Sequence, residues 1–491
     1  MIPIIDVITT LEAQGLLISS VPERDFAITG ISDDSRAVRP GDLYCAILGY
    51  SDDGHRYLAD AARAGAVAAL VEHRNAEIEL AQFEVANSRR AAAIAAQLVF
   101  SHPAEHLKLV GVTGTNGKTT TALVARHVLE RRMPSGALGT LGAVDPSGQW
   151  FATGLTTPGP VAFARCLSEL KQHGARCVVA EVSSHALAQH RVDGVEFDVG
   201  VFTNLSRDHL DYHSDFDDYL AAKSRLAGLV ADDGTLVVNV DEPAWKRLPG
   251  GRLVLGFGSA PEADYRAVDV NYGPKGGKGG GSRWRLVAPD GEAEVRLPLL
   301  GEFNVMNSLA AAAVGGAFGL AVDELAQSLS EAPQVPGRLE VLVEQPLVLR
   351  DYAHTPDALR RVLVIARDLT DGRVIVVFGC GGERDRGKRP LMGRAAAEGA
   401  DYSIVTSDNP RNESSIGIIA EIVPGMAGAQ FEEIEDRRLA IERALELAGE
   451  GDLVLLAGKG HERYQIVGEE HRPFDEASIV TELLSRGGRK E

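Results

Sequence analysis

Short apolar runs alternate with amphipathic stretches along most of the chain. Residues 107–112 (LKLVGV) have the pattern of a short buried strand, and residues 119–132 (TTTALVARHVLERR), after a glycine-containing turn, have helical periodicity. Further strands are predicted at residues 175–182, 197–203, 234–240 and 252–258, with helical stretches between several of them. Because strands and helices alternate, we expect a mainly parallel sheet that is covered on both faces.

A second series of the same kind follows residues 335–340 (VPGRLE). Apolar runs at 346–352, 373–380, 401–408 and 451–460 are separated by helix-like segments such as 437–448, which predicts another doubly wound α/β domain. Nearer the start of the chain, the segment 41–70 joins a strand-like run to an alanine-rich helix. The stretch 273–284 (GPKGGKGGGSRW) is too rich in glycine for an element interior, so we expect a loop between two strands there.

The length of 491 residues suits about three compact domains. We place the boundaries near His106 and Pro336. The predicted fold class is therefore α/β with three domains, residues 1–106, 107–336 and 337–491, of which the last is doubly wound.

Composition and charge mainly exclude certain classes of partner and cellular location. The formal net charge of -19 argues against a surface that binds nucleic acid or an anionic membrane, so an anionic substrate must meet local cations. Four scattered cysteines without a CxxC pair indicate reduced thiols. The start of the chain does not resemble a signal peptide, and no stretch has about 18 uninterrupted apolar residues. We therefore expect a cytoplasmic protein with no nucleic-acid partner and no membrane insertion.

The strongest local motif is GVTGTNGKTTT at residues 111–121, where the predicted strand turns into the helix. Glycines let backbone N–H groups approach phosphate oxygens, Lys118 can reach the terminal phosphates, and Thr119 can ligate Mg²⁺. The motif predicts nucleoside triphosphate binding. It departs from the strict P-loop pattern at Val112, where glycine is usual, and the alternative is a glycine-rich turn with a solvated lysine.

Two further polar segments follow predicted strand ends. Glu181, in EVSSHAL, can hold a metal where open α/β sheets present ligands, although it could equally cap the next helix, and His185 could be structural. In TNLSRDHLDYH (203–213), His209 is a candidate Mg²⁺ contact, and Asp208 or Asp211 is a candidate orienting group.

Taken in order, the motifs resemble the Mur ligase family over nearly the whole chain. The blocks that carry the resemblance are GTNGKTT, TTPGP, EVSSHAL, TNLSRDHLDYH, YLAAKSRL, GEFNVMNSLAAAA, VPGRLE, DYAHTPDAL, GCGGERDRGKRPLMG, DNPRNE and AGKGHE. The resemblance implies an N-terminal domain for the UDP end of the substrate, a central ATP-binding domain of P-loop ATPase type, and a C-terminal domain for the incoming amino acid.

The activity implied by this resemblance belongs to peptidoglycan synthesis. It is the ATP- and Mg²⁺-dependent addition of meso-diaminopimelate to UDP-N-acetylmuramoyl-L-Ala-D-Glu, which proceeds through an acyl phosphate. We expect the enzyme to be a monomer. The alternative within the family is a lysine-adding ligase, while the D-Ala-D-Ala-adding relative and folylpolyglutamate synthetase are disfavoured by the DNPR motif and the UDP-site residues. A P-loop switch protein is the rival of a different class, but it leaves YLAAKSRL and the third domain unexplained.

Site residues are carried over from the resemblance in three groups. The UDP-substrate group consists of Asp33, Ser35, Tyr50, Ser51, Asp52, Thr156, Thr157, Ser183, Gln189 and Arg191. The sequence at Tyr50, Ser51 and Asp52 departs from the commoner sequence of that loop in the family. The ATP group consists of Gly114, Thr115, Asn116, Gly117, Lys118, Thr119, Thr120, Asn304, Asn307, Arg338, Asp351 and His354. The diaminopimelate group consists of Arg384, Asp408, Asn409, Pro410, Arg411, Gly458 and Glu462.

For Lys223, the local sequence pattern and the family resemblance predict different environments. By itself YLAAKSRL is typical of an amphipathic helix whose lysine lies in water. The resemblance instead implies a carbamylated lysine (N6-carboxylysine) that acts as a Mg²⁺ ligand together with Thr119, Glu181 and His209. It also implies catalytic roles for Lys118, Glu181, His209 and Lys223. Without the resemblance, an exposed turn is the plainer interpretation of Asp408–Asn409–Pro410.

Overall fold

The computed structural model describes residues 1–19, 26–49, 52–206, 208–209, 212–272 and 281–487. The chain divides into two compact units. The first consists of Met1–Val268, Leu286–Ala293 and Met306–Leu329, and the second of Asp269–Arg285, Glu294–Val305 and Ser330–Glu491. The division into three domains stays a prediction.

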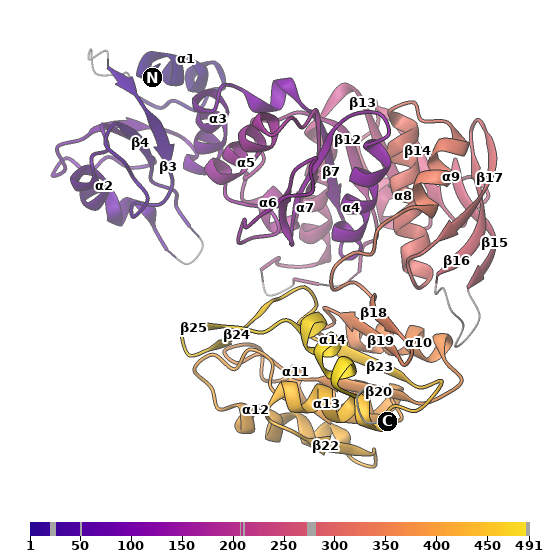
Figure 1. The fold of residues 1–491 in the computed structure, drawn as a ribbon. Helices are drawn as coiled ribbons and strands as arrows, with labels where there is room; N and C mark the ends of the chain where they lie inside the picture. Colours follow the sequence, from indigo (N-terminus) through magenta and orange to yellow (C-terminus); the bar gives the residue numbers. More distant parts are fainter. Residues whose placement is uncertain (20–25, 50–51, 207, 210–211, 273–280, 488–491) are drawn as a thin grey trace. The chain divides into compact units, whose positions relative to one another are not determined.

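The chain begins with a small parallel sheet in the order β3-β4-β5-β6. Its strands are β3 (Gly30–Ser32), β4 (Asp42–Cys45), β5 (Ala68–Val71) and β6 (Ala81–Glu84). Alternate strand residues pack on opposite faces: Leu43 and Cys45 meet α1 (Ile4–Ala13) and α3 (Ser88–Val99), whereas Tyr44 meets α2 (Leu58–Ala64). A short antiparallel pair, β1 (Ile2–Pro3) and β2 (Ala27–Ile28), lies beside α1 (Figure 1).

An eleven-stranded sheet follows, in the order β10-β9-β8-β11-β7-β12-β13-β14-β15-β16-β17. Pairing is parallel from β8 to β15 and antiparallel for β8 with β9 and β9 with β10, which confirms the expected mainly parallel sheet. The strands are β7 (Lys108–Thr113), β8 (Ser135–Gly139), β9 (Gly142–Val144), β10 (Trp150–Phe151), β11 (Cys177–Glu181), β12 (Phe197–Phe202), β13 (Val230–Asn239), β14 (Leu253–Gly258), β15 (Tyr265–Tyr272), β16 (Ser282–Ala288) and β17 (Gly291–Leu297).

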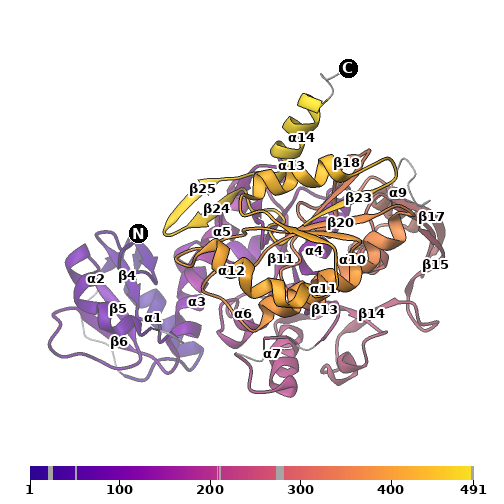
Figure 2. The same ribbon diagram turned by 90° about the horizontal axis from the view of Figure 1, so that it is seen from below.

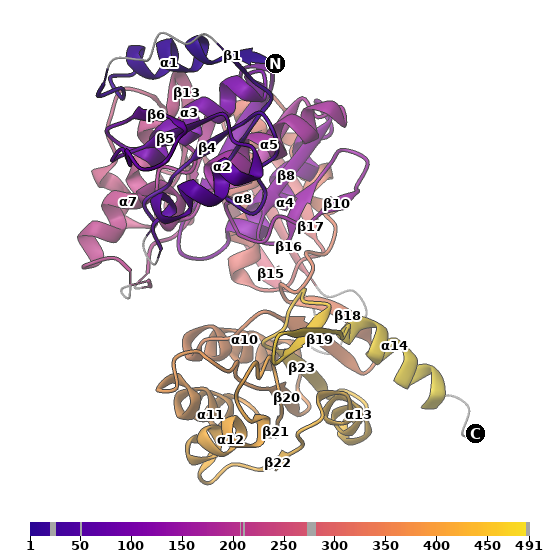
Figure 3. The same ribbon diagram turned by 90° about the vertical axis from the view of Figure 1, so that its left-hand side faces the viewer.

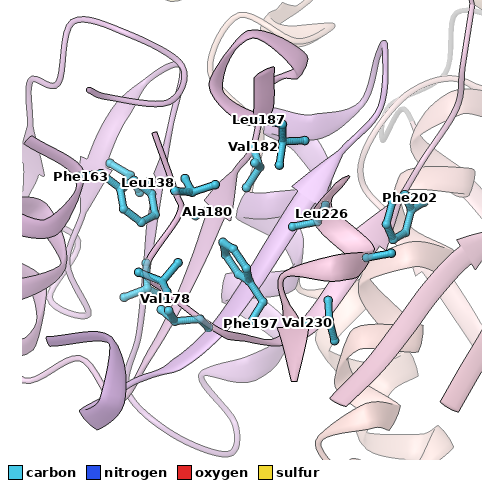
Figure 4. Close-up of a cluster of buried hydrophobic side chains, with 14 of the residues drawn as sticks. Leu138, Phe163, Val178, Ala180, Val182, Leu187, Phe197, Phe202, Leu226 and Val230 are labelled. Atoms are coloured by element: carbon cyan, nitrogen blue, oxygen red, sulfur yellow. The ribbon is translucent and has the colours of Figure 1, made fainter. Parts of the chain in front are cut away.

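Helices cover this sheet because its central strands are apolar on both faces. On one face, Val178 and Ala180 of β11 and Phe197 of β12 form a core with α5 (Pro160–Gln172), α6 (Ser184–Ala188) and α7 (Phe216–Gly228) (Figure 4). On the other face lies α4 (Lys118–Leu129), which contacts β8 and β11. The chain continues into α8 (Glu302–Ala317) and α9 (Val322–Ser330).

The last sheet has six strands in the order β18-β19-β23-β20-β21-β22, all parallel except the edge strand β18. These are β18 (Glu340–Glu344), β19 (Leu347–Asp351), β20 (Val374–Phe378), β21 (Tyr402–Val405), β22 (Phe431–Glu433) and β23 (Leu453–Ala457). One face is covered by α10 (Pro356–Leu369), α11 (Lys388–Gly399) and α12 (Ser415–Ile422), and the other by α13 (Arg437–Leu447) and α14 (Glu476–Gly487), as Figures 2 and 3 show. A hairpin of β24 (Tyr464–Val467) and β25 (Glu470–Pro473) follows β23.

The structure can be compared with the predictions for the elements, the glycine-rich loop and the cysteines. The predicted strands and helices lie where expected, but the predicted loop at 273–284 was wrong at its end, because β16 begins at Ser282 and buries Trp284. Residues 273–280 lie outside the described residues.

All four cysteines are free and buried, and burial raises the pKa of Cys166 to about 11. Among the described helices, none is both long enough and apolar enough to cross a membrane.

Candidate active site

The loop between β7 and α4 can be built only with glycine at two positions. Gly114 and Gly117 have φ values of +147° and +85°. A Cβ added at Gly114 would lie 1.9 Å from Thr203 Oγ1, and one at Gly117 would lie 2.3 Å from Asn307 Oδ1. Neighbouring side chains therefore fix the path of the loop, and Asn307 lies directly beside it.

The loop ends at the N-terminus of the twelve-residue helix α4, which favours negative charge. The backbone N–H of Asn116 donates to Asn204 Oδ1 (2.9 Å), which ties the loop to the segment after β12. Lys118 Nζ folds over the loop and donates to the carbonyl oxygens of Gly114 and Thr115, both at 2.9 Å. Thr119 and Thr120 occupy the first turn of α4 and are buried.

Glu181 ends β11, and its buried carboxylate faces the start of α4. Oε2 accepts a hydrogen bond from Thr119 Oγ1 (3.1 Å), while Oε1 accepts one from the backbone N–H of Thr140 (2.8 Å). The alternative that Glu181 caps the next helix was wrong, because the Ser183 hydroxyl caps α6 by accepting from Ala186 N. A hydroxyl and a carboxylate oxygen thus lie together beside the loop.

Lys223 lies on α7, and the interpretation of its segment as a solvated helix face was wrong. The side chain is only 1% exposed, and Nζ donates to the Gly114 carbonyl oxygen at 2.7 Å. It also lies 4.6 Å from the ring centroid of Tyr219. Burial, followed by the charge of Lys118, lowers the pKa of Lys223 well below its usual value. Within the described residues, no carboxylate lies at ion-pair distance from this lysine.

The rings of His185, His209 and His213 lie close together. The His185 ring lies 4.8 Å from that of His209 and 4.2 Å from that of Tyr212, measured between centroids. His209 has a φ of +52°, and its backbone N–H donates to Asp208 Oδ1 (2.9 Å). Asp211 lies outside the described residues. His185 is therefore packed among aromatic rings, whereas the assignment of His209 to a metal stays a prediction.

Five of the ten predicted UDP-substrate residues gather around the end of β11. Thr157 Oγ1 donates to the Glu181 carbonyl oxygen (2.8 Å), and Arg191 Nη1 donates to the Thr157 carbonyl oxygen (2.7 Å). Gln189 Oε1 accepts from Arg191 Nη2 at 2.8 Å. Thr140 Oγ1 lies 3.0 Å from the hydroxyl of Thr156. This cluster supplies a guanidinium, an amide and several hydroxyls in one place.

The residues predicted from the start of the chain are less closely grouped. Burial raises the pKa of Asp33, which lies close enough to Arg191 for their charges to interact. Ser35 is half-buried in the same turn. Asp52 is exposed and accepts a hydrogen bond from the Tyr57 hydroxyl at 2.8 Å. Tyr50 and Ser51 lie outside the described residues.

In the second unit, predicted nucleotide residues lie at the end of β19 and in the loop after it, with Arg338 nearby. The Arg338 guanidinium lies 4.9 Å from the centroid of the Tyr352 ring. Asp351 accepts from the N–H groups of Leu339 and Ala353, and its burial raises its pKa. His354 lies in the same loop, with its Nδ1 2.8 Å from the Tyr352 carbonyl oxygen. Asn304 Nδ2 donates to the Leu300 carbonyl oxygen at 2.8 Å, near the start of α8.

The predicted amino-acid residues occupy three loops at the carboxyl ends of parallel strands. Asp408 and Asn409 follow β21 and are 9% and 5% exposed, so the exposed-turn alternative was wrong. Arg411 donates from Nη1 to the Gly382 carbonyl oxygen (2.8 Å) in the loop after β20. Arg384, which is exposed, and Arg411, which is half-buried, both border Gly381.

The loop after β23 completes this group. Asp408 Oδ2 lies 2.9 Å from the position of a Cβ at Gly458, whose φ is +111°, so the two loops are in close contact there. Glu462 accepts a hydrogen bond at Oε2 from Asn409 Nδ2 (2.8 Å). Pro410, the next residue, is buried. The structure thus brings both charge signs together in these loops, while the assignment of the loops to the amino acid stays a prediction.

Family models match the chain in three consecutive stretches. They are described as "Mur ligase family, catalytic domain" (residues 27–110), "Mur ligase middle domain" (112–315) and "Mur ligase, glutamate ligase domain" (337–460). A protein of Geobacter metallireducens is 43% identical over 94% of this chain and 95% of its own, and one of Xylella fastidiosa is 42% identical over 97% and 98%. The chain belongs to the Mur ligase family. Both relatives bear the name UDP-N-acetylmuramoyl-L-alanyl-D-glutamate--2,6-diaminopimelate ligase.

Solved structures agree with this assignment to the Mur ligases. One with the same ligase name is 31% identical, covers 98% of this chain and 99% of its own, and has a TM-score of 0.68. A MurF ligase from Thermotoga maritima in complex with ADP is 20% identical over 93% and 97%, with a TM-score of 0.65, and shares the fold. The predicted family and α/β class are therefore confirmed.

Two residues of this Mur ligase were missed from the sequence although they contact the predicted ones. Thr140 donates to both carboxylate oxygens of Glu181, and it follows the end of β8, where ligand-contacting residues are common in parallel sheets. Lys459, inside the AGKGHE block, is fully buried against Asn409 and Glu462. No local pattern distinguishes such a lysine from a solvated one.

Proposed function

We propose that this Mur ligase uses ATP to join meso-diaminopimelate to the D-glutamate of UDP-N-acetylmuramoyl-L-Ala-D-Glu. The observation that carries the proposal is the shared name of relatives that are 41% to 43% identical and match at least 91% of this chain. The loop around Lys118 and the group of cations and carboxylates around Arg411 supply the chemistry that this reaction needs.

The first step is activation of the substrate carboxylate. The D-glutamyl γ-carboxylate attacks the γ-phosphorus of ATP, so that an acyl phosphate forms and ADP leaves. The N–H groups at the start of α4 bind phosphate oxygens, and Lys118 swings from its carbonyl contacts to offset the charge that gathers on the transferred group. Arg191, beside Thr157 and Gln189, holds the anionic UDP substrate.

The residues around Glu181 fit a Mg²⁺ site. The Thr119 hydroxyl and the Glu181 carboxylate, 3.1 Å apart, are oxygen ligands of the kind Mg²⁺ prefers. An ammonium at Lys223 would oppose a cation there, but the buried side chain with its lowered pKa favours the neutral amine, which is the form that reacts with CO₂. A carbamate at Lys223 would add an anionic oxygen ligand, with His209 as a further contact. Bound Mg²⁺ would neutralise charge on the phosphates.

The second step is capture of the acyl phosphate by an amine. The amine of diaminopimelate attacks the acyl carbon, a tetrahedral intermediate forms, and inorganic phosphate leaves. At the far end of the amino acid, Arg411 and Arg384 bind the carboxylate, while Asp408 and Glu462 receive the ammonium. We assign residues 1–106 to the UDP substrate, 107–336 to ATP and 337–491 to the amino acid, in a monomer that works in the cytoplasm.

One experiment tests substrate and reaction together. The purified protein is incubated with UDP-N-acetylmuramoyl-L-Ala-D-Glu, ATP and a panel of amino acids, and the nucleotide products are weighed by mass spectrometry. We expect the mass of the diaminopimelate adduct and ADP release only when the UDP-dipeptide is present. An adduct with lysine alone would favour the lysine-adding alternative, and slow ATP hydrolysis without any adduct would favour a P-loop switch protein.

A further inference from the structure

Lys459 is a buried lysine in the C-terminal unit that the proposed reaction has not used. It lies between two glycines with positive φ, Gly458 (+111°) and Gly460 (+52°), in the loop that follows β23. A Cβ at Gly460 would lie 2.7 Å from Tyr352 Cβ, so this loop is packed closely against its neighbours. The backbone therefore directs the lysine inward, where it is 0% exposed.

The Lys459 ammonium joins two residues of the amino-acid group. Nζ donates to Asn409 Oδ1 (3.0 Å) and to Glu462 Oε2 (3.2 Å), and Asn409 Nδ2 donates to the same Glu462 oxygen (2.8 Å). Asn409 Oδ1 also accepts from the backbone N–H of Ile466 at 3.0 Å. This closed set of hydrogen bonds fixes which way the asparagine amide faces and where the carboxylate stands.

Burial decides the kind of role that this lysine can have. A fully buried ammonium cannot touch the amino acid, but removing it would leave a carboxylate without its charge partner, which is costly in a low-dielectric site. Glu462, whose side chain is 17% exposed, remains accessible at its outer edge. The ammonium therefore holds the carboxylate in place from its buried side, at 3.2 Å, while the outer side of that carboxylate stays open.

The charge of Lys459 also bears on the choice of amino acid. With Lys459 added, the predicted amino-acid group contains three cations, Arg384, Arg411 and Lys459, and two carboxylates, Asp408 and Glu462. Its excess positive charge favours a ligand whose far end carries a carboxylate as well as an ammonium. Lysine, whose far end is only cationic, is disfavoured by the same excess.

We propose that Lys459 is a positioning residue that orients Asn409 and Glu462 for the far end of the amino acid and favours diaminopimelate over lysine. The proposal rests on the proposed function, because it deepens the assignment of the same pocket. It adds a determinant that never contacts the substrate.

The test uses two variants of the full-length protein with steady-state constants for all three substrates. Lys459→Met removes charge and hydrogen bonds, and Lys459→Gln removes the charge but keeps a donor. We expect the diaminopimelate KM to rise about ten-fold to a hundred-fold in the Met variant and less in the Gln variant, with the KM of ATP and of UDP-dipeptide unchanged. The preference for diaminopimelate over lysine in kcat/KM should fall in both.

Arg373→Met is the matched control. Arg373 pairs with Asp452 (2.7 Å) just before β20 and β23, at the opposite ends of the strands whose carboxyl ends carry the pocket. We expect this variant to keep the wild-type amino-acid KM and preference. Diaminopimelate constants within two-fold of wild type in either folded Lys459 variant, or equal rises for all three substrates, would overturn the proposal. A wild type that makes no adduct would instead refute the proposed function.

Discussion

The loop that we assign to ATP and the pocket that we assign to the amino acid are built in different ways. The loop is one continuous stretch, residues 113–119, whose shape comes from glycine conformations and from hydrogen bonds made by its backbone N–H and carbonyl groups. The pocket takes side chains from the loops after β20, β21 and β23, and hydrogen bonds made by those side chains hold it. Changes in the loop should therefore stop the chemistry, whereas changes in the pocket should alter the choice and affinity of one substrate.

The largest effect should come from Lys118→Ala. This substitution removes the cation that we propose binds phosphate, from a loop that other contacts hold, so ligation should fall by about a thousand-fold or more while the fold stays intact. The measurement is ADP and adduct formation at saturating ATP, with thermal unfolding to check the fold. Lys246→Ala, at an exposed lysine in the same unit, is the control. Near-normal turnover in Lys118→Ala would show that the loop does not bind the triphosphate.

Lys223→Ala should be nearly as damaging, because it removes the proposed carbamate. We expect almost no activity and no rescue by bicarbonate, but partial rescue by acetate, which can place a carboxylate in the vacated space. Turnover is measured with acetate and with chloride at the same ionic strength. Full activity in the variant, or a sharp density map of active enzyme with an unmodified ammonium at Lys223, would contradict the carbamate.

An intermediate effect, confined to one substrate, is expected at Arg411. Arg411→Ala should raise the KM for diaminopimelate by roughly ten-fold to a thousand-fold, at about 1.4 kcal/mol per factor of ten, with ATP and UDP-dipeptide constants nearly unchanged. Arg411→Lys should recover little, because an ammonium cannot form the two-pronged contact of a guanidinium. A rise confined to the ATP constant would move this arginine to the nucleotide site.

The smallest effect should come from a pair outside both sites. Burial raises the pKa of Asp452, but hydrogen bonds from Arg373 and from two backbone N–H groups outweigh it, so the pKa is lowered overall. A lowered pKa means that the pair stabilises the fold above pH 3.8, the usual value, and that this stability is lost as the pH falls through the folded value. In denaturant titrations, Arg373→Met should cost about 1 kcal/mol at pH 7 and less near pH 3. An equal cost at both pH values would exclude the ionised carboxylate as the cause.

The sequence predicted elements and loops better than the burial of charged side chains. Apolar runs located β7, β11, β12 and β20 because each strand is buried on both faces, and the glycines of the P-loop located the turn. Lys223 and Lys459 could not be located in this way. Their burial depends on partners far along the chain, Gly114 for one and Asn409 for the other, and a helical or loop lysine carries no local sign of such a partner.

The two hydrophobic cores of the C-terminal sheet bear on how new substrates evolve. Ile375 and Val377 of β20 fill one core, while Val374, Val376 and Phe378 fill the other. Losing one residue inside β20 would exchange these sets, so we expect an insertion or deletion there to destabilise the fold. The loops that follow the strands carry no such constraint. Divergence can therefore proceed by changing loop residues such as Arg384 and Arg411, and a new preference can arise while the scaffold keeps its stability.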